Sequence, residues 1–477
     1  MIFLSHYVVF FTIKGGSKMP EYRVEEDTLG PVKIPAKALW GPQTERSRNN
    51  FSTGQFMPLV VIRALLQIKK AAAQANKELG QLSSEKADLI TKAIDKLLVL
   101  DDEELRKDFP LRVYQTGSGT QTNMNTNEVI ANKAAELDSS IEVLPNDDVN
   151  HGQSSNDIFP TAMNITASVA VAELEKAAQH LIDELKEKQK KYWHTVKIGR
   201  THLQDATPLT FGQEVSGWVS TLEHDLDYLK NLDHTLLELA MGGTAVGTGL
   251  NAAPGFADDI AARVSDVYGQ KFTAEVNKFY GLAAHSGLNV VHGAIKTLAS
   301  DLMKIANDIR FLASGPRAAY DELNIPANEP GSSIMPGKVN PTQAEAITMA
   351  AVRVMGNDVV VTMASSQGNF EMNVYKPVLI DAFLESAELL RGTMESFADK
   401  LIHGLTVNKK RMQELVDNSL MTVTALSPHI GYHDSAKIAQ AADKAGSTLR
   451  EAALKSGRVT PEQFDEWVNP LKMTKVD

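Results

Sequence analysis

Apolar residues repeat at helical spacing along several long stretches of the chain. The clearest stretch covers residues 289–313, where apolar side chains alternate at intervals of three and four: Ile295, Leu298, Leu302, Ile305, Ile309 and Leu312. This heptad pattern predicts a long helix with one buried seam. Similar patterns run over residues 158–192, 213–240 and 342–363. A helix of about 25 residues is roughly 38 Å long, so we predict an elongated bundle.

Strand-like segments are few, and the predicted fold class is therefore mainly α. The chain has 477 residues, a length that suggests about three domains. We predict an N-terminal mixed or helical domain, a central long-helix bundle and a small helical C-terminal domain, over residues 19–152, 153–378 and 379–477. Residues 1–18 are considered separately, because Met19 resembles a natural translation start more closely than Met1 does. We interpret them as a non-native or disordered extension.

Composition narrows the class of protein. The chain is 43% hydrophobic and 22% charged, as in ordinary soluble globular proteins. Its net charge of −11 argues against nucleic acid or an anionic membrane as a partner. The absence of cysteine excludes disulfides and thiolate catalysis. No metal-ligand spacing such as HExxH occurs, so we expect no metal or cofactor. We also find no targeting signal or transmembrane segment, and we expect a cytoplasmic protein.

The most informative polar segment covers residues 331–341, with the sequence GSSIMPGKVNP. Its glycines and prolines favour a bent loop over a regular element. Asn340 before Pro341, with Gln343 following, predicts a capping box in which Asn340 is the N-cap. Lys338 beside the free N–H groups of that helix start favours a carboxylate or phosphate. The segment is typical of an enzyme's active-site loop.

Three further polar clusters precede predicted helices, at residues 116–123, 153–157 and 199–208. Each places hydroxyl and amide groups where a helix N-terminus favours an anion. Taken singly, each cluster is better explained as an ordinary helix cap, because Ser, Thr and Asn are common caps. His202 in the third cluster becomes a candidate base if the fold brings Glu345 to orient its imidazole. The glycine-rich residues 241–251 lack a Walker lysine and the GxGxxG spacing, and we interpret them as a tight turn.

These motifs together resemble those of the fumarase/aspartase superfamily, in the form found in class II, iron-independent fumarate hydratases. Residues 331–341, 199–208, 117–125 and 153–157 match the superfamily motifs, and the resemblance extends from about Met19 to the C-terminus. His202 and Gly337 side with fumarases, because aspartases carry Gln and usually Ala there. The resemblance implies a three-domain subunit and a homotetramer whose central helices form one core. It also implies a tricarboxylic acid cycle enzyme that hydrates fumarate to (S)-malate reversibly, with each active site built from three chains.

The resemblance also implies roles for individual residues. Ser332 would remove the C3 proton of malate, and His202, oriented by Glu345, would activate or receive the water at C2. Lys338 and Asn340 would hold a substrate carboxylate. Further substrate hydrogen bonds would come from Ser118, Thr120, Ser154, Ser155, Asn156 and Thr201. The reaction needs such donors, because removing a proton beside a carboxylate builds a dianionic, aci-carboxylate-like intermediate.

One departure concerns a second dicarboxylate site that many fumarases carry near the surface. They have a His just before Pro-Asn-Asp, with a basic residue upstream. Here Leu144 takes the place of that His, and residues 141–143 supply no base, although Asn146 and Asp147 remain. We therefore predict that dicarboxylates do not occupy this site.

Two alternative functions stay open at this level. Aspartate ammonia-lyase is the nearest enzyme alternative, and a non-catalytic helical scaffold is the alternative from another class. A scaffold has no need to keep all four of the polar residues Ser332, His202, Lys338 and Asn340, and their presence argues for an enzyme.

Overall fold

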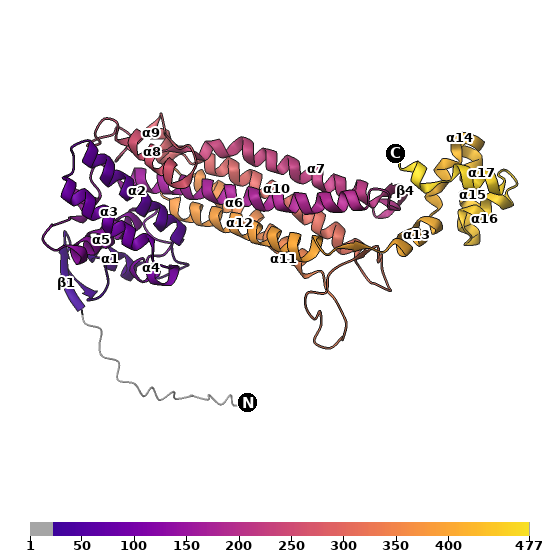
Figure 1. Ribbon diagram of the computed structural model, residues 1–477, viewed down its shortest axis with the longest axis horizontal. Helices are drawn as coiled ribbons and strands as arrows, with labels where there is room; N and C mark the ends of the chain where they lie inside the picture. Colours follow the sequence, from indigo (N-terminus) through magenta and orange to yellow (C-terminus); the bar gives the residue numbers. More distant parts are fainter. Residues whose placement is uncertain (1–21, 477) are drawn as a thin grey trace, which may run out of the picture. The chain divides into compact units, whose positions relative to one another are not determined.

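The computed structural model describes residues 22–476, so the predicted extension over residues 1–18 lies outside the described residues. The chain forms two compact units, which meet in the sequence at His151 and Gly152. Helices dominate both units (Figure 1). The predicted mainly-α class is confirmed.

The first unit is a small helical assembly with one β-hairpin. Its elements are β1 (Tyr22–Asp27), β2 (Gly30–Pro35), α1 (Pro42–Asn50), α2 (Leu59–Glu78), α3 (Ser84–Leu98), α4 (Asp102–Asp108), α5 (Thr120–Leu137) and a short π-helix, η1 (Pro145–Val149). β1 and β2 pair antiparallel. Helix α3 packs against α2 and α5, and Leu89, Ala93 and Ala134 are buried together between α3 and α5.

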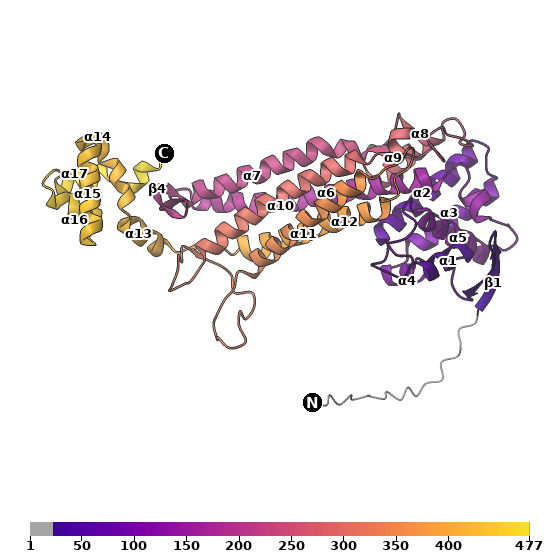
Figure 2. The ribbon, with the colours of Figure 1, turned by 180° about the vertical axis from the view of Figure 1, so that it is seen from behind.

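The second unit is built on five long helices that run side by side (Figures 1 and 2). They are α6 (Ser155–Lys191), α7 (Phe211–Leu232), α10 (Ser286–Leu312), α11 (Thr342–Ser365) and α12 (Lys376–Phe397). α6 packs on α7 and α12, and α11 packs on α10 and α12. All six residues of the predicted heptad seam are buried in α10. The helices predicted over residues 158–192, 289–313 and 342–363 match α6, α10 and α11. The helix predicted over residues 213–240 corresponds to α7 but ends earlier, at Leu232.

Helix α12 was missed as a long helix, although Leu379, Ile380, Phe383, Leu390 and Met394 repeat along it at helical spacing and are all buried. Because α12 packs along α6 and α11, the long-helix bundle continues to its end. The domain boundary predicted between residues 378 and 379 falls inside this helix.

Shorter elements connect the bundle and follow it. Between the long helices are β3 (Val196–Thr201), β4 (Gln204–Thr210), η2 (Asp233–Leu236), β5 (Glu238–Leu239), α8 (Phe256–Tyr268), β6 (Thr273–Ala274), α9 (Lys278–Ala283) and β7 (Leu323–Asn324). After the bundle come η3 (Ala398–Ile402), β8 (Thr406–Val407), α13 (Lys409–Asn418), η4 (Leu420–Ala425), α14 (Ser427–Ile430), α15 (Tyr432–Ala445), α16 (Leu449–Lys455), α17 (Pro461–Trp467) and α18 (Pro470–Met473). The strands pair as β1–β2, β3–β4, β5–β6 and β7–β8.

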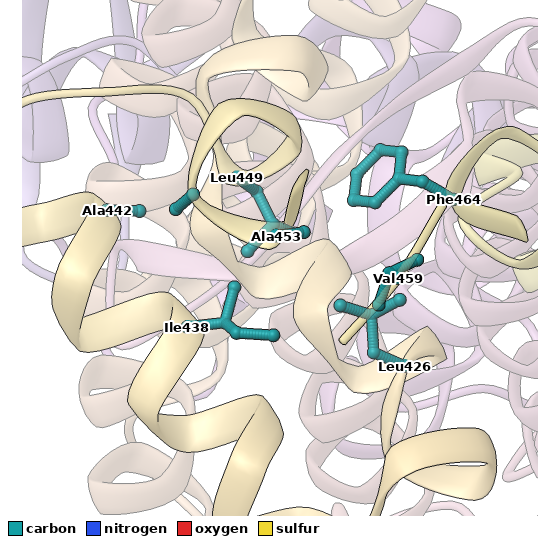
Figure 3. Close-up of a cluster of buried hydrophobic side chains, with 8 residues drawn as sticks. Leu426, Ile438, Ala442, Leu449, Ala453, Val459 and Phe464 are labelled. Atoms are coloured by element: carbon teal, nitrogen blue, oxygen red, sulfur yellow. The ribbon is translucent and has the colours of Figure 1, made fainter. Parts of the chain in front are cut away.

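The C-terminal helices have an apolar cluster of their own (Figure 3). It consists of the buried residues Leu426, Ile438, Ala442, Leu449, Ala452, Ala453, Val459 and Phe464. Trp467 packs against this cluster and stacks on His429 with ring centroids 4.0 Å apart. Burial of this set gives the short helices a shared hydrophobic core.

One helix in the described part of the chain, α11, is long and apolar enough to cross a membrane by length and composition. It lies against α10 and α12 within the bundle. On its other side, large apolar residues remain exposed in the single chain: Met349, Val352, Val359, Val360 and Met363.

Candidate active site

The loop over residues 331–341 is closed on itself by hydrogen bonds. The backbone N–H of Gly331 donates to the Lys338 carbonyl at 2.9 Å, and Asn340 Nδ2 donates to the Gly331 carbonyl at 2.7 Å. A Cβ on Gly331 would collide with the Lys338 carbonyl. Glycine is therefore required where the two ends of the loop meet.

Within this loop the Ser332 hydroxyl oxygen accepts two backbone hydrogen bonds. The donors are the N–H groups of Ile334, at 3.3 Å, and of Met335, at 3.1 Å. Ser332 is half-buried, whereas Ser333 is exposed. Two N–H dipoles aimed at one oxygen stabilise negative charge on it.

The predicted capping box at this loop is wrong. α11 begins at Thr342 with Pro341 as the N-cap, and no side chain caps it. The Asn340 amide is used to close the loop on Gly331, and the Gln343 side-chain oxygen accepts from Asn328 Nδ2 at 2.9 Å. The Asn340 side chain, which the local sequence pattern assigns to helix capping, therefore closes the loop instead.

Three of the predicted site residues, Lys338, Asn340 and Glu345, line one open cavity of about 870 Å³. The cavity lies at the C-terminal end of α10, where Asn307, Arg310 and Asn324 also line it. Arg310 was missed by the sequence analysis because it lies on the polar side of a helix, where arginine is ordinary. Its guanidinium donates to Asn307 Oδ1 at 3.1 Å. The cavity thus carries two cationic side chains that can pair with an anionic group, together with the carboxylates of Asp321 and Glu345.

His202 lies at the tip of the β3–β4 hairpin. It follows Thr201, the last residue of β3, and it is exposed together with Leu203. His202 and Leu203 have φ values of 55° and 60°, the left-handed backbone that a two-residue hairpin turn of type I′ needs. Such conformations cost energy in residues other than Gly and Asn and are concentrated at functional sites. The cluster predicted as a loop is therefore a hairpin that presents the imidazole to solvent in the single chain.

A buried charge cluster supports the base of this hairpin. Arg200 Nη1 donates to Glu322 Oε2 at 2.6 Å, and Glu322 is fully buried. Lys197 Nζ donates to Glu214 Oε1 at 3.1 Å and lies 4.0 Å from Glu322. Burial raises the pKa of Glu214, opposed by Lys197. Gly199, at the bulge between Ile198 and Arg200, has no room for a side chain, because a Cβ would meet the Thr207 carbonyl at 2.5 Å.

The hairpin and the cavity lie at the same end of the bundle. Glu322, the ion-pair partner of Arg200, directly precedes β7, and β7 lines the cavity that contains Lys338 and Glu345. His202 and Glu345 are nevertheless not joined by any hydrogen bond or ion pair within residues 22–476. The predicted orientation of His202 by Glu345 is therefore absent inside one described chain.

Ser154, Ser155 and Asn156 form the start of α6. Ser154 is the N-cap in a capping box with Asp157, so the helix-cap explanation of this cluster is confirmed. Asp157 Oδ2 also accepts the N–H groups of Gly242, at 3.1 Å, and Thr244, at 2.8 Å. The glycine-rich turn predicted over residues 241–251 therefore packs directly on the N-terminus of α6.

Two buried titratable residues near this helix start were not singled out as site residues. Lys376 is fully buried, and its Nζ donates to the Asn156 carbonyl at 3.4 Å and to Met372 Sδ at 3.3 Å. Burial lowers the pKa of Lys376 to about 7. Burial, with a smaller effect of the Lys376 charge, lowers the pKa of His285 to about 3. His285 and His292 are both buried. Lys376 directly precedes a proline. From the sequence alone, this pattern indicates only the start of a helix.

Ser118 and Thr120 belong to the first unit. Their hydroxyl oxygens lie 2.7 Å apart at the start of α5, which begins at Thr120 with Gly119 as its N-cap. The helix therefore begins inside the polar cluster of residues 116–123 and not after it. The early start places Thr120 in the first turn, where a hydroxyl can meet an anion.

Two groups of predicted site residues lie at opposite ends of one helix. Ser154–Asn156 begin α6, and β3 with His202 follows its C-terminal end. α6 has 37 residues and is therefore about 55 Å long. A four-carbon dicarboxylate cannot reach both groups of the same chain.

The segment predicted not to bind dicarboxylate forms η1. Asp148 at its centre accepts the Leu144 N–H at 2.8 Å and Lys86 Nζ at 2.7 Å. The sequence analysis missed Lys86, because it lies on α3, far along the chain. Its charge is paired with Asp148, and Leu144 is partly exposed at 37%.

No group of three or more His, Asp or Glu side chains placed to hold a metal ion occurs within residues 22–476. The polar groups that line the described cavity include the cations Lys338 and Arg310, the Asn340 amide and the carboxylates of Asp321 and Glu345. The two cations can pair with the carboxylate groups of an organic ligand.

Comparison with known proteins identifies the family that the chain resembles. Residues 30–356 match the family model described as lyase, and residues 423–475 match the one described as fumarase C C-terminus. The class II fumarate hydratase of Listeria monocytogenes serovar 1/2a is 56% identical over 456 residues, which is 95% of this chain and 100% of the relative. The Bacillus subtilis (strain 168) class II fumarate hydratase is 54% identical over 463 residues, covering 95% of this chain and 99% of the relative.

A solved structure agrees with the sequence relatives. The class II fumarase from Schistosoma mansoni superposes with a TM-score of 0.91 at 44% identity, over 95% of this chain and 99% of that chain. The match covers both described units and the helices around the candidate residues. This chain belongs to the lyase family, and within it to the class II fumarate hydratases.

Proposed function

We propose that this chain is an enzyme that hydrates fumarate to (S)-malate reversibly, by general acid–base catalysis. Membership of the class II fumarate hydratases supports this function, and so does the presence of Ser332, His202, Lys338 and Asn340 in their motifs. The observation that carries the chemistry is the pair of backbone N–H groups that meet the Ser332 hydroxyl oxygen.

Ser332 acts as the base at C3 in the dehydration direction. A serine hydroxyl is a poor base unless its alkoxide is stabilised, and the N–H groups of Ile334 and Met335 together with the Lys338 charge supply that stabilisation. Removal of the C3 proton moves an electron pair into the neighbouring carboxylate and forms the aci-carboxylate. Lys338 and Asn340 bind that carboxylate and stabilise its growing charge.

His202 acts at C2. It gives a proton to the departing hydroxyl, and water leaves as the C2–C3 double bond forms. In the hydration direction the same imidazole takes a proton from the attacking water. Glu345 orients the imidazole, and Thr201 with Ser118, Thr120, Ser154, Ser155 and Asn156 supplies the remaining substrate hydrogen bonds.

The working enzyme is a homotetramer with active sites shared between three chains. The length of α6 supports sharing, since Ser154–Asn156 and His202 of one chain lie about 55 Å apart along it. The lack of a contact between His202 and Glu345 in the single chain supports it as well. The exposed apolar residues of α11 support association through the bundle.

The function is tested by following fumarate absorbance with purified protein, offering (S)-malate and L-aspartate separately. We expect fumarate from malate and none from aspartate. Fumarate from aspartate alone would make the protein an ammonia-lyase. No turnover of either substrate by a folded tetramer would contradict the proposal and favour a scaffold.

The shared site is tested by complementation between two inactive variants. Ser154→Ala and His202→Asn chains are mixed, dissociated and reassembled. If the two groups come from different chains, some sites in the mixed tetramers contain neither substitution, and activity returns. A mixture as inactive as its components would contradict a shared site. The cytoplasmic location remains a prediction.

A further inference from the structure

Lys376 is a buried cation without a carboxylate partner in the described part of the chain. Its side chain is fully buried, and its ammonium donates only to the Asn156 carbonyl and Met372 Sδ. Burying an ammonium costs several kcal/mol unless a compensating charge is near.

The nearest anion, Asp157, is already engaged by other donors. Its Oδ1 accepts the Ser154 N–H at 2.9 Å, and its Oδ2 accepts the N–H groups of Gly242 and Thr244. Asp157 stabilises the charged form of Lys376 at a distance, and burial outweighs it and lowers the Lys376 pKa to about 7. The positive charge is therefore only partly compensated in the protein without ligand.

Two titratable groups interact electrostatically with Lys376. Asp157 comes from α6 and favours the charged form of Lys376, and His285 comes from the start of α10, where burial keeps it neutral. The His285 Nε2 has no hydrogen-bond partner among the described residues. Lys278 on α9 is half-buried, and Glu275 acts on it more strongly than Asp157 does.

The Lys376 ammonium lies beside the first turn of α6, because it donates a hydrogen bond to the Asn156 carbonyl. The dipole of a helix favours an anion at its N-terminal turn. A buried charge acts there with little screening by water or salt. Its effect adds to that of the helix dipole.

We propose that Lys376 is a positioning residue for the substrate, whose positive charge, acting through the first turn of α6, holds a dicarboxylate at Ser154–Asn156. This inference rests on the proposed function of those residues in substrate binding. Lys376 does not touch the substrate. It supplies charge from behind the backbone and hydroxyl groups that do.

The test measures binding of succinate, a dicarboxylate that cannot react, by titration calorimetry. Lys376→Met removes the charge and keeps the apolar stem. Lys376→Gln removes the charge and keeps a hydrogen-bond donor for the Asn156 carbonyl. We expect succinate affinity to fall roughly tenfold in both variants, with KM for fumarate rising more than kcat falls.

The matched control is Lys188→Met. Lys188 is also buried, its Nζ donates to a backbone carbonyl, that of His403, at 2.6 Å, and burial lowers its pKa. It lies at the other end of α6, so we expect succinate affinity to stay unchanged.

The dependence on pH separates a charge from a packing effect. Between pH 6.5 and pH 9, succinate affinity should fall in the wild type as Lys376 loses its proton, and it should stay level in Lys376→Met. Wild-type affinity in both Lys376 variants, or recovery in Lys376→Gln alone, would overturn the inference. Because calorimetry needs no turnover, failure of the hydratase assay in the wild type would be seen separately. Should Lys376→Met fail to fold, Lys376→Gln carries the same test.

Discussion

Arg200 and Glu322, which are 122 residues apart in the chain, form a 2.6 Å ion pair that joins the hairpin bearing His202 to the strand that lines the Lys338 cavity. The Glu322 side chain is fully buried, and Arg200 is 12% exposed. Tyr320 also packs against the guanidinium, 4.5 Å from ring centroid to Cζ. The pair therefore couples two predicted parts of the active site.

We predict that Arg200→Met destabilises the protein and lowers activity. It leaves the Glu322 carboxylate buried with Lys197 4.0 Å away, and removing one partner of a buried pair costs about 3–5 kcal/mol. Thermal unfolding should show a Tm lower by several degrees. Arg450→Met is the control, because Arg450 and Asp465 form a pair with side chains 47% and 60% exposed. Equal Tm values for the two variants would contradict the prediction.

Ser332→Ala should abolish most activity without affecting stability. It removes the oxygen that meets the N–H groups of Ile334 and Met335, and loss of a general base lowers kcat by about 10²–10⁴-fold. Steady-state kinetics and Tm are the measurements. Ser333→Ala, at the exposed neighbour, should keep full activity. If Ser332→Ala keeps wild-type kcat, Ser332 is not the base.

His202→Asn separates chemistry from backbone strain. Asn tolerates the φ of 55° at this turn, so the hairpin should persist while kcat falls by about 10²–10⁴-fold. Leu203→Asn at φ 60° is the matched control, and it should keep activity with an equal or higher Tm. A large Tm loss in His202→Asn would show that the imidazole serves the fold.

Asp225→Asn should stabilise the protein above neutral pH. Asp225 on α7 is buried, and burial followed by repulsion from Asp301 raises its pKa from 3.8 to about 7. A raised folded-state pKa favours the protonated folded protein, so stability is lost as pH rises from about 4 through 7. Asp225→Asn has no carboxyl group to ionise, so it does not lose this stability as the pH rises.

The gain from Asp225→Asn should be roughly 2–4 kcal/mol per chain at pH 8 and small at pH 4. Denaturant unfolding across that range measures it. Asp227→Asn, at an exposed position of the same helix, should change little at either pH. The predicted sign would be wrong if the free energy of unfolding of the wild type rose between pH 4 and pH 7 by the amount expected for Asp225.

Crystals soaked in malate should show no dicarboxylate beside Asn146 and Asp147. Leu144 offers no cation there, and the nearby Lys86 ammonium is held by Asp148 at 2.7 Å. Clear ligand density at this position would refute the prediction. Density in the cavity around Lys338 in the same crystals would show that the soak worked.

The sequence by itself determined the helical class, four of the five long helices and the identity of the polar motifs. Helical periodicity is a local property, so the seam from Ile295 to Leu312 could be read directly. α12 has the same kind of pattern and could have been found. The family motifs are short and continuous, and they too are visible without coordinates.

Only the tertiary structure decided which of these groups meet. The Asn340 side chain closes a loop onto Gly331 and leaves the helix uncapped. Lys376 and Asn156, 220 residues apart, come together beneath α6, while the 37 residues of α6 separate Asn156 from His202. Burial and partners of polar groups depend on packing between distant segments. No local pattern of residues contains that information.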